Sequence, residues 1–222
     1  MARGKKTATG RSKSSERWLN RQRKDPYARQ AVGEGNVSRA YYKLAELDRR
    51  FKLIRADSLV LELGAAPGGW TRYVESKVAT GSLIVCDPRP IQAAAETHVI
   101  EGEYGEPWVA ARIQERLGAR QLDLVLSDMA PNITGVRATD QALAMELAEL
   151  ASMAADDWMK PGGNLVVKMF QGEGFEAAVA EMRNKFAKIK VVKPKASRPE
   201  SREVYAVGQQ FLAPGSWCRL LS

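Results

Sequence analysis

The stretch that decides the fold is LELGAAPGGW, residues 61–70, together with the apolar residues that lead into it. Residues 58–66 (SLVLELGAA) are typical of a buried strand that enters a glycine-rich turn, and residues 70–78 (WTRYVESKV) are typical of a helix. Gly64, Gly68 and Gly69 follow the strand directly, and glycines at this point let a ligand approach the backbone closely. A strand, a glycine turn and a helix predict the first unit of an α/β fold.

The rest of the chain continues the alternation of strands and helices. Further strands are expected at residues 81–88, 97–103, 122–129, 165–170, 188–193 and 203–211, and further helices at 107–118, 140–159 (stopped by PGG, 161–163) and 175–186. An amphipathic helix at 36–55, with Ser38 as its cap, is expected to precede them. This order predicts a mostly parallel, seven-stranded sheet with helices on both faces, which binds ligands beyond the carboxyl ends of its strands.

Composition limits the class of protein. A chain of 222 residues with 45% apolar and 27% charged residues suits one globular domain. No apolar stretch reaches the roughly 20 residues that a membrane helix needs, and no signal peptide is visible. The cysteines are Cys86 and Cys218 and the single histidine is His98, which disfavours a disulfide framework and a zinc site. A reducing cytoplasm is therefore expected.

The positive charge is concentrated at the N-terminus. Residues 1–24 hold nine Lys or Arg and one Glu, whereas the remaining chain is balanced. We expect 1–24 to be a basic RNA-binding arm that is disordered when free, although a solubilising tail or a transit peptide are alternatives. Residues 25–212 are expected to form a single domain, and residues 213–222 a tail without an assigned function.

The first strands carry a candidate nucleoside site. The glycine spacing is G-x-x-x-G-G with Pro67 inside it, which makes a poor cradle for a pyrophosphate. Asp87 ends the second strand, where an acid can accept both ribose hydroxyls, and Glu103 follows the third strand, where it can face an adenine. These features suit S-adenosylmethionine, which carries a ribose and an adenine but no phosphate. The alternative is that the glycines only make tight turns.

A lysine interrupts an apolar strand further along. Lys168 lies within LVVKMF (165–170), and burying an ammonium group is costly unless the group is paired or neutral. It is therefore either a structural exception or a reactive group. A thiolate nucleophile is less well placed, because Cys86 precedes Asp87 by one residue and should point away from the ligand side, and Cys218 lies in the tail.

Asp128 and Lys168, at the ends of their strands, suit methylation of an alcohol. An alcohol is a weak acid, so the transfer benefits from a base that takes its proton. A lysine can be that base if its pKa falls toward neutrality, through burial of Lys168 or through a second cation such as Lys43. Asp128 could orient Lys168, and Glu203 could hold Lys43 or the substrate hydroxyl. Taken singly, Lys43 is equally well explained as a solvated helix residue and Glu203 as a surface acid.

Five segments carry a family resemblance. They are SRAYYKL (38–44), LGAAPGGW (63–70), SDMAPN (127–132), VVKMFQGEGF (166–175) and SRPESREVY (197–205). In their order and spacing the chain resembles the FtsJ/RrmJ family of ribose 2′-O-methyltransferases, in particular its bacterial ribosomal members, from about Ser15 to Gly208. The resemblance implies a Rossmann-like S-adenosylmethionine-dependent methyltransferase fold. It implies a catalytic tetrad, which consists of Lys43, Asp128, Lys168 and Glu203. It also implies cofactor contacts at Gly64, Gly68, Trp70, Asp87, Glu103 and Asp128. Glu103 departs from the Asp of close relatives.

The resemblance also implies a substrate, a uridine of large-subunit (23S) rRNA that is met on the assembled 50S subunit. Methylation of tRNA and a non-catalytic role in ribosome assembly remain alternatives. No metal is expected, and we expect a monomer. Because no RRM or KH signature is present, RNA contact is expected from charge, through the arm 1–24, Arg39 and the basic segment 188–198.

Overall fold

A seven-stranded sheet runs through the part of the chain that the structure describes, residues 25–212 of a computed structural model. Its strands are β1 (Leu59–Leu63), β2 (Ser82–Asp87), β3 (His98–Glu101), β4 (Leu122–Ser127), β5 (Met159–Phe170), β6 (Phe186–Val192) and β7 (Glu203–Phe211). They lie in the order β3-β2-β1-β4-β5-β7-β6, and in this sheet β7 runs opposite to the other six strands. The predicted mostly parallel, seven-stranded sheet is confirmed. The predicted arm and tail, 1–24 and 213–222, lie outside the described residues.

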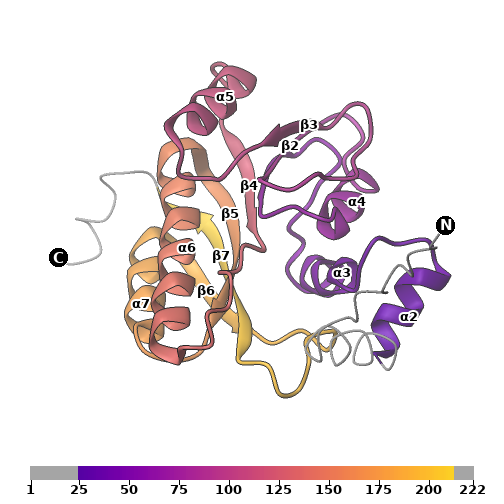
Figure 1. The fold of residues 1–222 in the computed structure, drawn as a ribbon. Coiled ribbons are helices and arrows are strands. Elements are labelled where there is room, and N and C mark those ends of the chain that lie inside the picture. Colours follow the sequence, from indigo (N-terminus) through magenta and orange to yellow (C-terminus); the bar gives the residue numbers. More distant parts are fainter. Residues whose placement is uncertain (1–24, 213–222) are drawn as a thin grey trace, which may run out of the picture.

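Helices cover both faces of the sheet (Figure 1). They are α2 (Pro26–Gly33), α3 (Ala40–Phe51), α4 (Gly69–Glu75), α5 (Pro107–Leu117), α6 (Arg137–Trp158) and α7 (Phe175–Lys185). α3 and α4 pack on one face, where their apolar residues join those of the strands in one buried cluster. α5, α6 and α7 pack on the other face in a second cluster. The Rossmann-like methyltransferase arrangement predicted from the sequence is therefore present.

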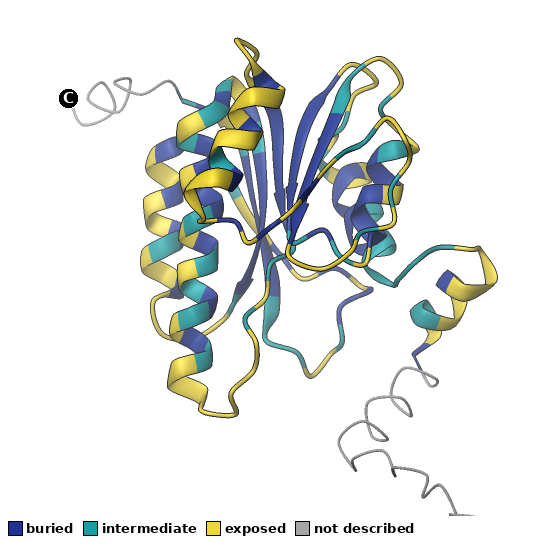
Figure 2. Ribbon diagram, turned by 45° about the horizontal axis from the view of Figure 1, so that its top comes forward, coloured by how far each residue is buried: buried dark blue, intermediate teal, exposed yellow. Residues whose placement is uncertain are grey.

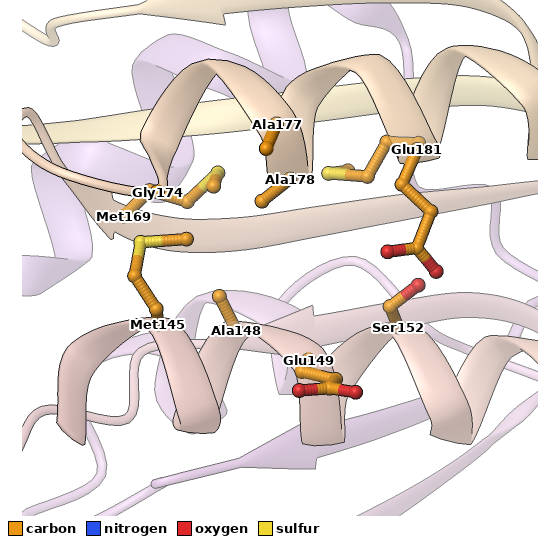
Figure 3. A pocket seen from close by; sticks show the side chains of 10 residues that line it. Met145, Ala148, Glu149, Ser152, Met169, Gly174, Ala177, Ala178 and Glu181 are labelled. Carbon is orange, nitrogen blue, oxygen red and sulfur yellow. The ribbon is translucent and has the colours of Figure 1, made fainter. Parts of the chain in front are cut away.

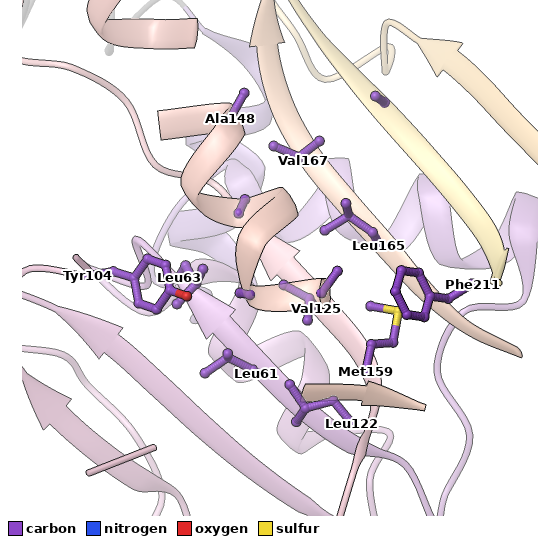
Figure 4. Packing of buried hydrophobic residues seen from close by; sticks show 14 of the residues in the cluster. Leu61, Leu63, Tyr104, Leu122, Val125, Ala148, Met159, Leu165, Val167 and Phe211 are labelled. Carbon is purple, nitrogen blue, oxygen red and sulfur yellow. The ribbon is translucent and has the colours of Figure 1, made fainter. Parts of the chain in front are cut away.

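The strands are buried on both faces because helices lie on each (Figure 2). All five residues of β1 are buried, and Leu61 and Leu63 point to the cluster under α6, beside Val125 and Val167 (Figure 4). α6 meets the sheet through small residues at helical spacing, which allow a close approach; they are Ala144, Ala148, Ala151 and Ala155. This close packing fixes where the strand ends lie.

One helix was missed, and two local predictions were wrong. α2 was not expected; Asp25 begins it by accepting hydrogen bonds from the amides of Tyr27 and Ala28. The predicted helix 36–55 is shorter, because α3 spans Ala40–Phe51 and Lys52 follows in the left-handed region. The PGG segment does not separate α6 from the next strand. It lies inside β5, where the pairing with β4 is interrupted between Leu122 and Leu124.

The carboxyl ends of β1, β2, β4 and β5 meet at one edge of the sheet. There the Asp128 amide donates to the Leu63 carbonyl at 3.0 Å, which continues the β1–β4 pairing one residue past β4. Asp128 is therefore held by backbone directly beside the glycine turn that follows β1. In residues 25–212, none of the helices combines the length and the apolar character needed to cross a membrane.

Candidate active site

Four predicted residues come together at this edge of the sheet. Lys168 of β5 lies with its Nζ 2.9 Å from Asp128 Oδ1 and 2.7 Å from the Asp128 carbonyl oxygen. Lys43 of α3 lies with its Nζ 2.6 Å from Glu203 Oε1, at the start of β7. The two lysines are nearly fully buried. The tetrad that the family resemblance implied is thus a pair of buried ion pairs.

Tyr205, which the sequence reasoning did not single out, joins the two ion pairs. Its hydroxyl donates to Asp128 Oδ1 at 2.7 Å and lies 3.3 Å from Glu203 Oε1, and it accepts from Lys43 Nζ at 3.2 Å. Tyr205 stands opposite Lys168 in the β5–β7 register, so the two side chains share a face. Burial, with the charges of Asp128 and Glu203, raises the pKa of Tyr205 well above its usual value, and the hydroxyl stays a donor.

The two carboxylates of this cluster stay ionised. Burial alone would raise the pKa of Asp128, but the charges of Lys168 and Lys43 and the hydrogen bonds from Lys168 and Tyr205 outweigh it and lower that pKa. Burial is likewise outweighed at Glu203, where the charges of Lys43 and Lys168 lower the pKa. Lys168 therefore meets a fixed negative charge on one side. We call Lys43, Asp128, Lys168, Glu203 and Tyr205 the charged cluster.

A cleft of about 490 Å³ opens beside the charged cluster. Its lining includes Gly64, Asp87, Glu103, Asp128 and Lys168. Four of the predicted cofactor residues thus share one cavity with the predicted base, and the cavity lies within the size range of small-molecule sites. The cleft has room for a nucleoside-sized ligand that reaches from Asp87 to Lys168.

Asp87 is prepared to accept hydrogen bonds. Its carboxylate, which is 2% exposed, accepts from the Ala66 amide at 2.9 Å and from the Arg89 amide at 2.9 Å. The Arg89 guanidinium also contacts both carboxylate oxygens, with Nε 3.1 Å from Oδ1 and Nη2 3.2 Å from Oδ2. The Arg89 side chain is 69% exposed and lines the cleft. A ribose that bound Asp87 would therefore share the carboxylate with Arg89.

The glycine turn serves close packing between chain segments. A Cβ on Gly64, whose φ is +73°, would lie 2.7 Å from the Met129 amide nitrogen, and one on Gly68, whose φ is +106°, would lie 2.6 Å from the Gln92 carbonyl oxygen. Gly64 lines the cleft, whereas Gly68 is not among the lining residues. The position of Gly64 therefore fits both explanations of this glycine, a tight turn and close approach of a ligand to the backbone.

Trp70 does not point into the cleft. Its side chain is 1% exposed, its Nε1 donates to the Ala40 carbonyl at 2.9 Å, and its ring packs against Tyr205 at a centroid distance of 5.5 Å. The ring therefore couples α4 to α3 and to the charged cluster. Its backbone lies in the first turn of α4, where helix amides are available to a ligand; that is the part of Trp70 which a cofactor could contact.

Cys86 is closer to the cleft than expected. The prediction that it points away from the ligand side is wrong, because it is among the residues that line the cleft. Its Sγ donates to the Gly102 carbonyl at 3.3 Å, and burial, followed by the nearby charge of Asp87, raises its pKa to about 12. The thiol is protonated at neutral pH and is a poor nucleophile. Cys218 lies outside the described residues.

Glu62 is a buried acid that the sequence reasoning passed over. It lies in β1, is 1% exposed, and accepts from Thr71 Oγ1 at 2.9 Å, which ties β1 to α4. Burial, with a contribution from the charge of Asp128, raises its pKa to about 8. The signal in the sequence was the same as for Lys168, one ionisable residue in an apolar strand.

The raised pKa of Glu62 makes the stability of the fold depend on pH. The unfolded chain releases this proton near pH 4.5 and the folded chain near pH 8. Between these values the folded state binds more protons, so the free energy of unfolding falls as pH rises, by about 1.4 kcal/mol per pH unit from this group. We expect Glu62→Gln to remove this slope. Urea unfolding at pH 5, 6.5 and 8 measures it.

The control for this prediction is Glu101→Gln, which changes an exposed acid at the end of β3. Its unfolding curves should follow those of the wild type at every pH. If Glu62→Gln also follows the wild type from pH 5 to pH 8, Glu62 is charged in the folded protein and the assignment is wrong.

A separate cavity of about 230 Å³ lies between α6 and α7 (Figure 3). Met145 and Met169 point into it from α6 and β5, and Glu149 and Glu181 lie along it (Figure 3). Met169 follows Lys168 and faces the opposite side of the sheet from the charged cluster. This cavity is therefore distinct from the cleft. In the described range 25–212, no group of three or more His, Cys, Asp or Glu side chains is arranged to hold a metal ion.

Two known proteins match most of the length of this chain. Ribosomal RNA large subunit methyltransferase E of Stenotrophomonas maltophilia (strain R551-3) is 46% identical over 200 residues, which cover 90% of this chain and 95% of that relative. The protein of the same name from Pseudomonas fluorescens (strain Pf0-1) is 46% identical over 196 residues, 88% of this chain and 94% of that relative.

The fold comparison gives the same result. A crystal structure of a Plasmodium falciparum protein described as a ribosomal RNA methyltransferase matches with a TM-score of 0.71 and 25% identity, over 80% of this chain and 99% of that one. A family model for the FtsJ-like methyltransferases matches residues 36–211, which include every residue of the charged cluster and of the cleft. The chain is a methyltransferase and belongs to the FtsJ-like methyltransferase family.

Proposed function

We propose that this chain methylates the ribose 2′-hydroxyl of a uridine in large-subunit (23S) rRNA, on the assembled 50S subunit in the cytoplasm. The observation that carries the proposal is the placement of Lys168, held by Asp128, in the wall of the cleft. The names of the relatives support the choice of rRNA. An alcohol substrate suits this site better than a carbon atom, because the thiol of Cys86, a cysteine that lines the cleft, is protonated.

The residues of the cleft suit S-adenosylmethionine as the cofactor. Asp87 would hold the ribose hydroxyls, Glu103 the adenine, and Gly64 would allow close contact with the backbone. The cavity contains these acids, and its lining lacks a cluster of basic residues for a pyrophosphate. Glu103 and Asp87 follow neighbouring strands, so the base and ribose contacts would be adjacent. S-adenosylmethionine, when bound, supplies an electrophilic methyl group.

The charged cluster would handle the proton of the substrate. Lys168 Nζ would accept the proton of the 2′-hydroxyl, which requires the neutral amine when the hydroxyl arrives. The Asp128 carbonyl and carboxylate hold Nζ in a fixed position. Lys43 holds Glu203 in place through its ion pair. Tyr205 keeps both carboxylates in place by hydrogen bonding.

The test is methyl transfer to defined RNAs. The full chain is incubated with labelled S-adenosylmethionine and with total tRNA, naked rRNA or large subunits from cells that lack this methylation, and the labelled nucleotide is mapped. Label on the 2′-oxygen of one uridine in the large subunit supports the proposal. Label on tRNA would assign the same chemistry to a different RNA. Calorimetry without any S-adenosylmethionine binding would favour a non-catalytic assembly factor.

We further propose that the basic segment 188–198 and the arm 1–24 contact the RNA. Lys188 and Lys190 are exposed on β6, the edge strand of the sheet, whereas Lys193 Nζ donates to the Pro199 and Ser201 carbonyls and holds the loop before Glu203. Arg39 and Arg198 both pair with Asp25, so the described chain immediately after the arm is joined to this region.

Deletion of residues 1–24 is expected to weaken RNA binding and to reduce its dependence on salt. Each lost phosphate contact should lower the slope of log K against log salt by about 0.7–0.9. Filter binding of large subunits from 50 to 300 mM salt, roughly the range over which counterion release is measured, gives the slope. The control is the full chain with all arm lysines and arginines changed to Gln. An unchanged slope for both proteins would show that the arm makes no phosphate contacts.

A further inference from the structure

A second cavity of about 270 Å³ lies at the same edge of the sheet as the cleft. We call it the edge pocket; its lining residues are Pro131, Ile133, Asp140, Gln141, Phe170, Glu200 and Arg202. Pro131 lines both the edge pocket and the cleft, so the two cavities adjoin. None of the roles proposed for the charged cluster uses the edge pocket.

The edge pocket is built from the neighbours of the charged cluster. Phe170 is two residues after Lys168 on β5, so both side chains leave the strand on the same side. Arg202 directly precedes Glu203, and Pro131 is three residues after Asp128. A nucleotide whose 2′-hydroxyl met Lys168 would therefore bring its base or its phosphate to the edge pocket.

The charge of the edge pocket favours the base of the nucleotide over its phosphate. Asp140 and Glu200 bring two carboxylates and Arg202 one guanidinium, so the lining is net negative. Hydrogen bonds from the Thr134 hydroxyl and amide lower the pKa of Asp140, which is thus ionised at neutral pH. A phosphate would be repelled. A neutral, flat group fits between the apolar Pro131, Ile133 and Phe170.

Buried hydrogen bonds hold the pocket in shape. Gln141 of α6 is 6% exposed, and its Nε2 donates to the carbonyls of Phe170 and Glu173, each at 3.0 Å. Its Oε1 accepts from Arg202 Nη1, which also donates to the Gln171 carbonyl at 3.0 Å. A Cβ on Gly172 would lie 2.6 Å from Gln141 Oε1, so glycine is needed there. The backbone at Phe170 and the guanidinium of Arg202 are therefore both held in place.

We propose that the edge pocket binds the nucleobase of the nucleotide that is methylated, displaced from the RNA stack. This inference rests on the proposed function, since it places the base by the position of its ribose at Lys168. Phe170 would stack on the base, the carboxylates would accept its N–H groups, and Arg202 would donate to its carbonyl oxygens. Recognition of an unstacked base by an aromatic face and polar edges is how proteins read single-stranded RNA.

The test compares Phe170→Ala with Phe170→Tyr on large subunits that lack the methylation. Loss of a stacked base should lower kcat/KM for the subunit about 5- to 150-fold in Phe170→Ala, and the retained ring in Phe170→Tyr should largely restore it. The Kd for S-adenosylmethionine, measured by calorimetry, should be unchanged in both. Met153→Ala, which shortens an exposed side chain of α6 away from this edge, is the control and should match the wild type.

A substrate without the base gives the direct readout. This substrate is a reconstituted subunit whose mapped target nucleotide lacks its base. On it, kcat/KM of the wild type should fall by the same factor as Phe170→Ala loses on the intact subunit. Removing the base should lower kcat/KM of Phe170→Ala only a little further. If Phe170→Ala and the wild type have equal kcat/KM, the edge pocket does not bind the base and the proposal is overturned. The proposal is also overturned if the losses from Phe170→Ala and from removal of the base add up on the baseless substrate. A wild type that methylates none of the RNAs would instead overturn the proposed function. A changed cofactor Kd in Phe170→Ala would assign Phe170 to support of the cleft and also overturn the proposal.

Discussion

Lys168→Met is expected to lose methyl transfer while the protein still binds its cofactor. Methionine keeps the length and the apolar stem of the side chain but cannot accept a proton. General-base catalysis contributes roughly 10²- to 10⁴-fold to a rate, and single-turnover methylation of large subunits should fall by about that factor. The cofactor Kd should change little, because the acids at the far end of the cleft, Asp87 and Glu103, are untouched.

The control for this variant lies on the same strand. Lys160→Met removes a lysine of β5 that is also paired with an aspartate, since Lys160 Nζ lies 2.6 Å from Asp123 Oδ1. Lys160 is at the opposite end of the strand from the charged cluster, so its loss should change stability slightly and leave turnover per folded molecule unchanged. Near-normal turnover of Lys168→Met would remove Lys168 as the base.

The arrangement of strands and helices could be predicted because local patterns and the global fold agree here. β1, β4 and the second half of β5 are short apolar runs that lead into glycine, Asp128 and a second glycine stretch, and each is followed by a helical pattern. β2 is a similar apolar run that ends at Asp87 and leads through a loop to β3. The position of a polar residue at a strand end then follows from the parallel order. That is why Lys168, Asp128 and Asp87 could be placed at one edge from the sequence.

The contacts between side chains could not be predicted in the same way. Tyr205 joins the two ion pairs only because β7 lies antiparallel to β5 with Tyr205 opposite Lys168, and no local pattern sets that register. Trp70 was expected at the cofactor, but its ring lies in the core because α3 offers the Ala40 carbonyl as a partner. The Arg89–Asp87 contact likewise depends on how the loop after β2 turns back.

Asp128 occupies the point where the cleft and the charged cluster meet. It lines the cleft, its Oδ1 contacts Lys168 Nζ and the Tyr205 hydroxyl, and its amide is held by Leu63. Asp128→Asn keeps the shape of the side chain and removes its charge. Lys43 and Lys168 would then share the single carboxylate of Glu203 in a buried site. Leaving a buried charge unpaired typically costs about 3–5 kcal/mol of stability.

We expect Asp128→Asn to lose turnover at least as strongly as Lys168→Met and, unlike it, to weaken cofactor binding. The folded-state pKa of Asp128 is lowered from 3.8, so its contribution to stability is present above that pH and is lost as the pH falls through the lower, folded value. The stability difference between wild type and variant should therefore be full at pH 7 and shrink below about pH 4. Urea unfolding across this range measures it.

Asp123→Asn separates the loss of a buried charge from the loss of the site. Asp123 is on β4 like Asp128, and its Oδ1 pairs with Arg55 and Lys160 at the other end of the strand. Burial would raise its pKa, but hydrogen bonds from the Leu59 amide, Lys160 and Arg55 lower it. Asp123→Asn should thus also lower the free energy of unfolding, because Arg55 and Lys160 lose their charged partner. It should nevertheless methylate large subunits at the wild-type rate per folded molecule. If both variants lose turnover equally, the loss comes from a weakened sheet, and Asp128 has no place of its own in the chemistry.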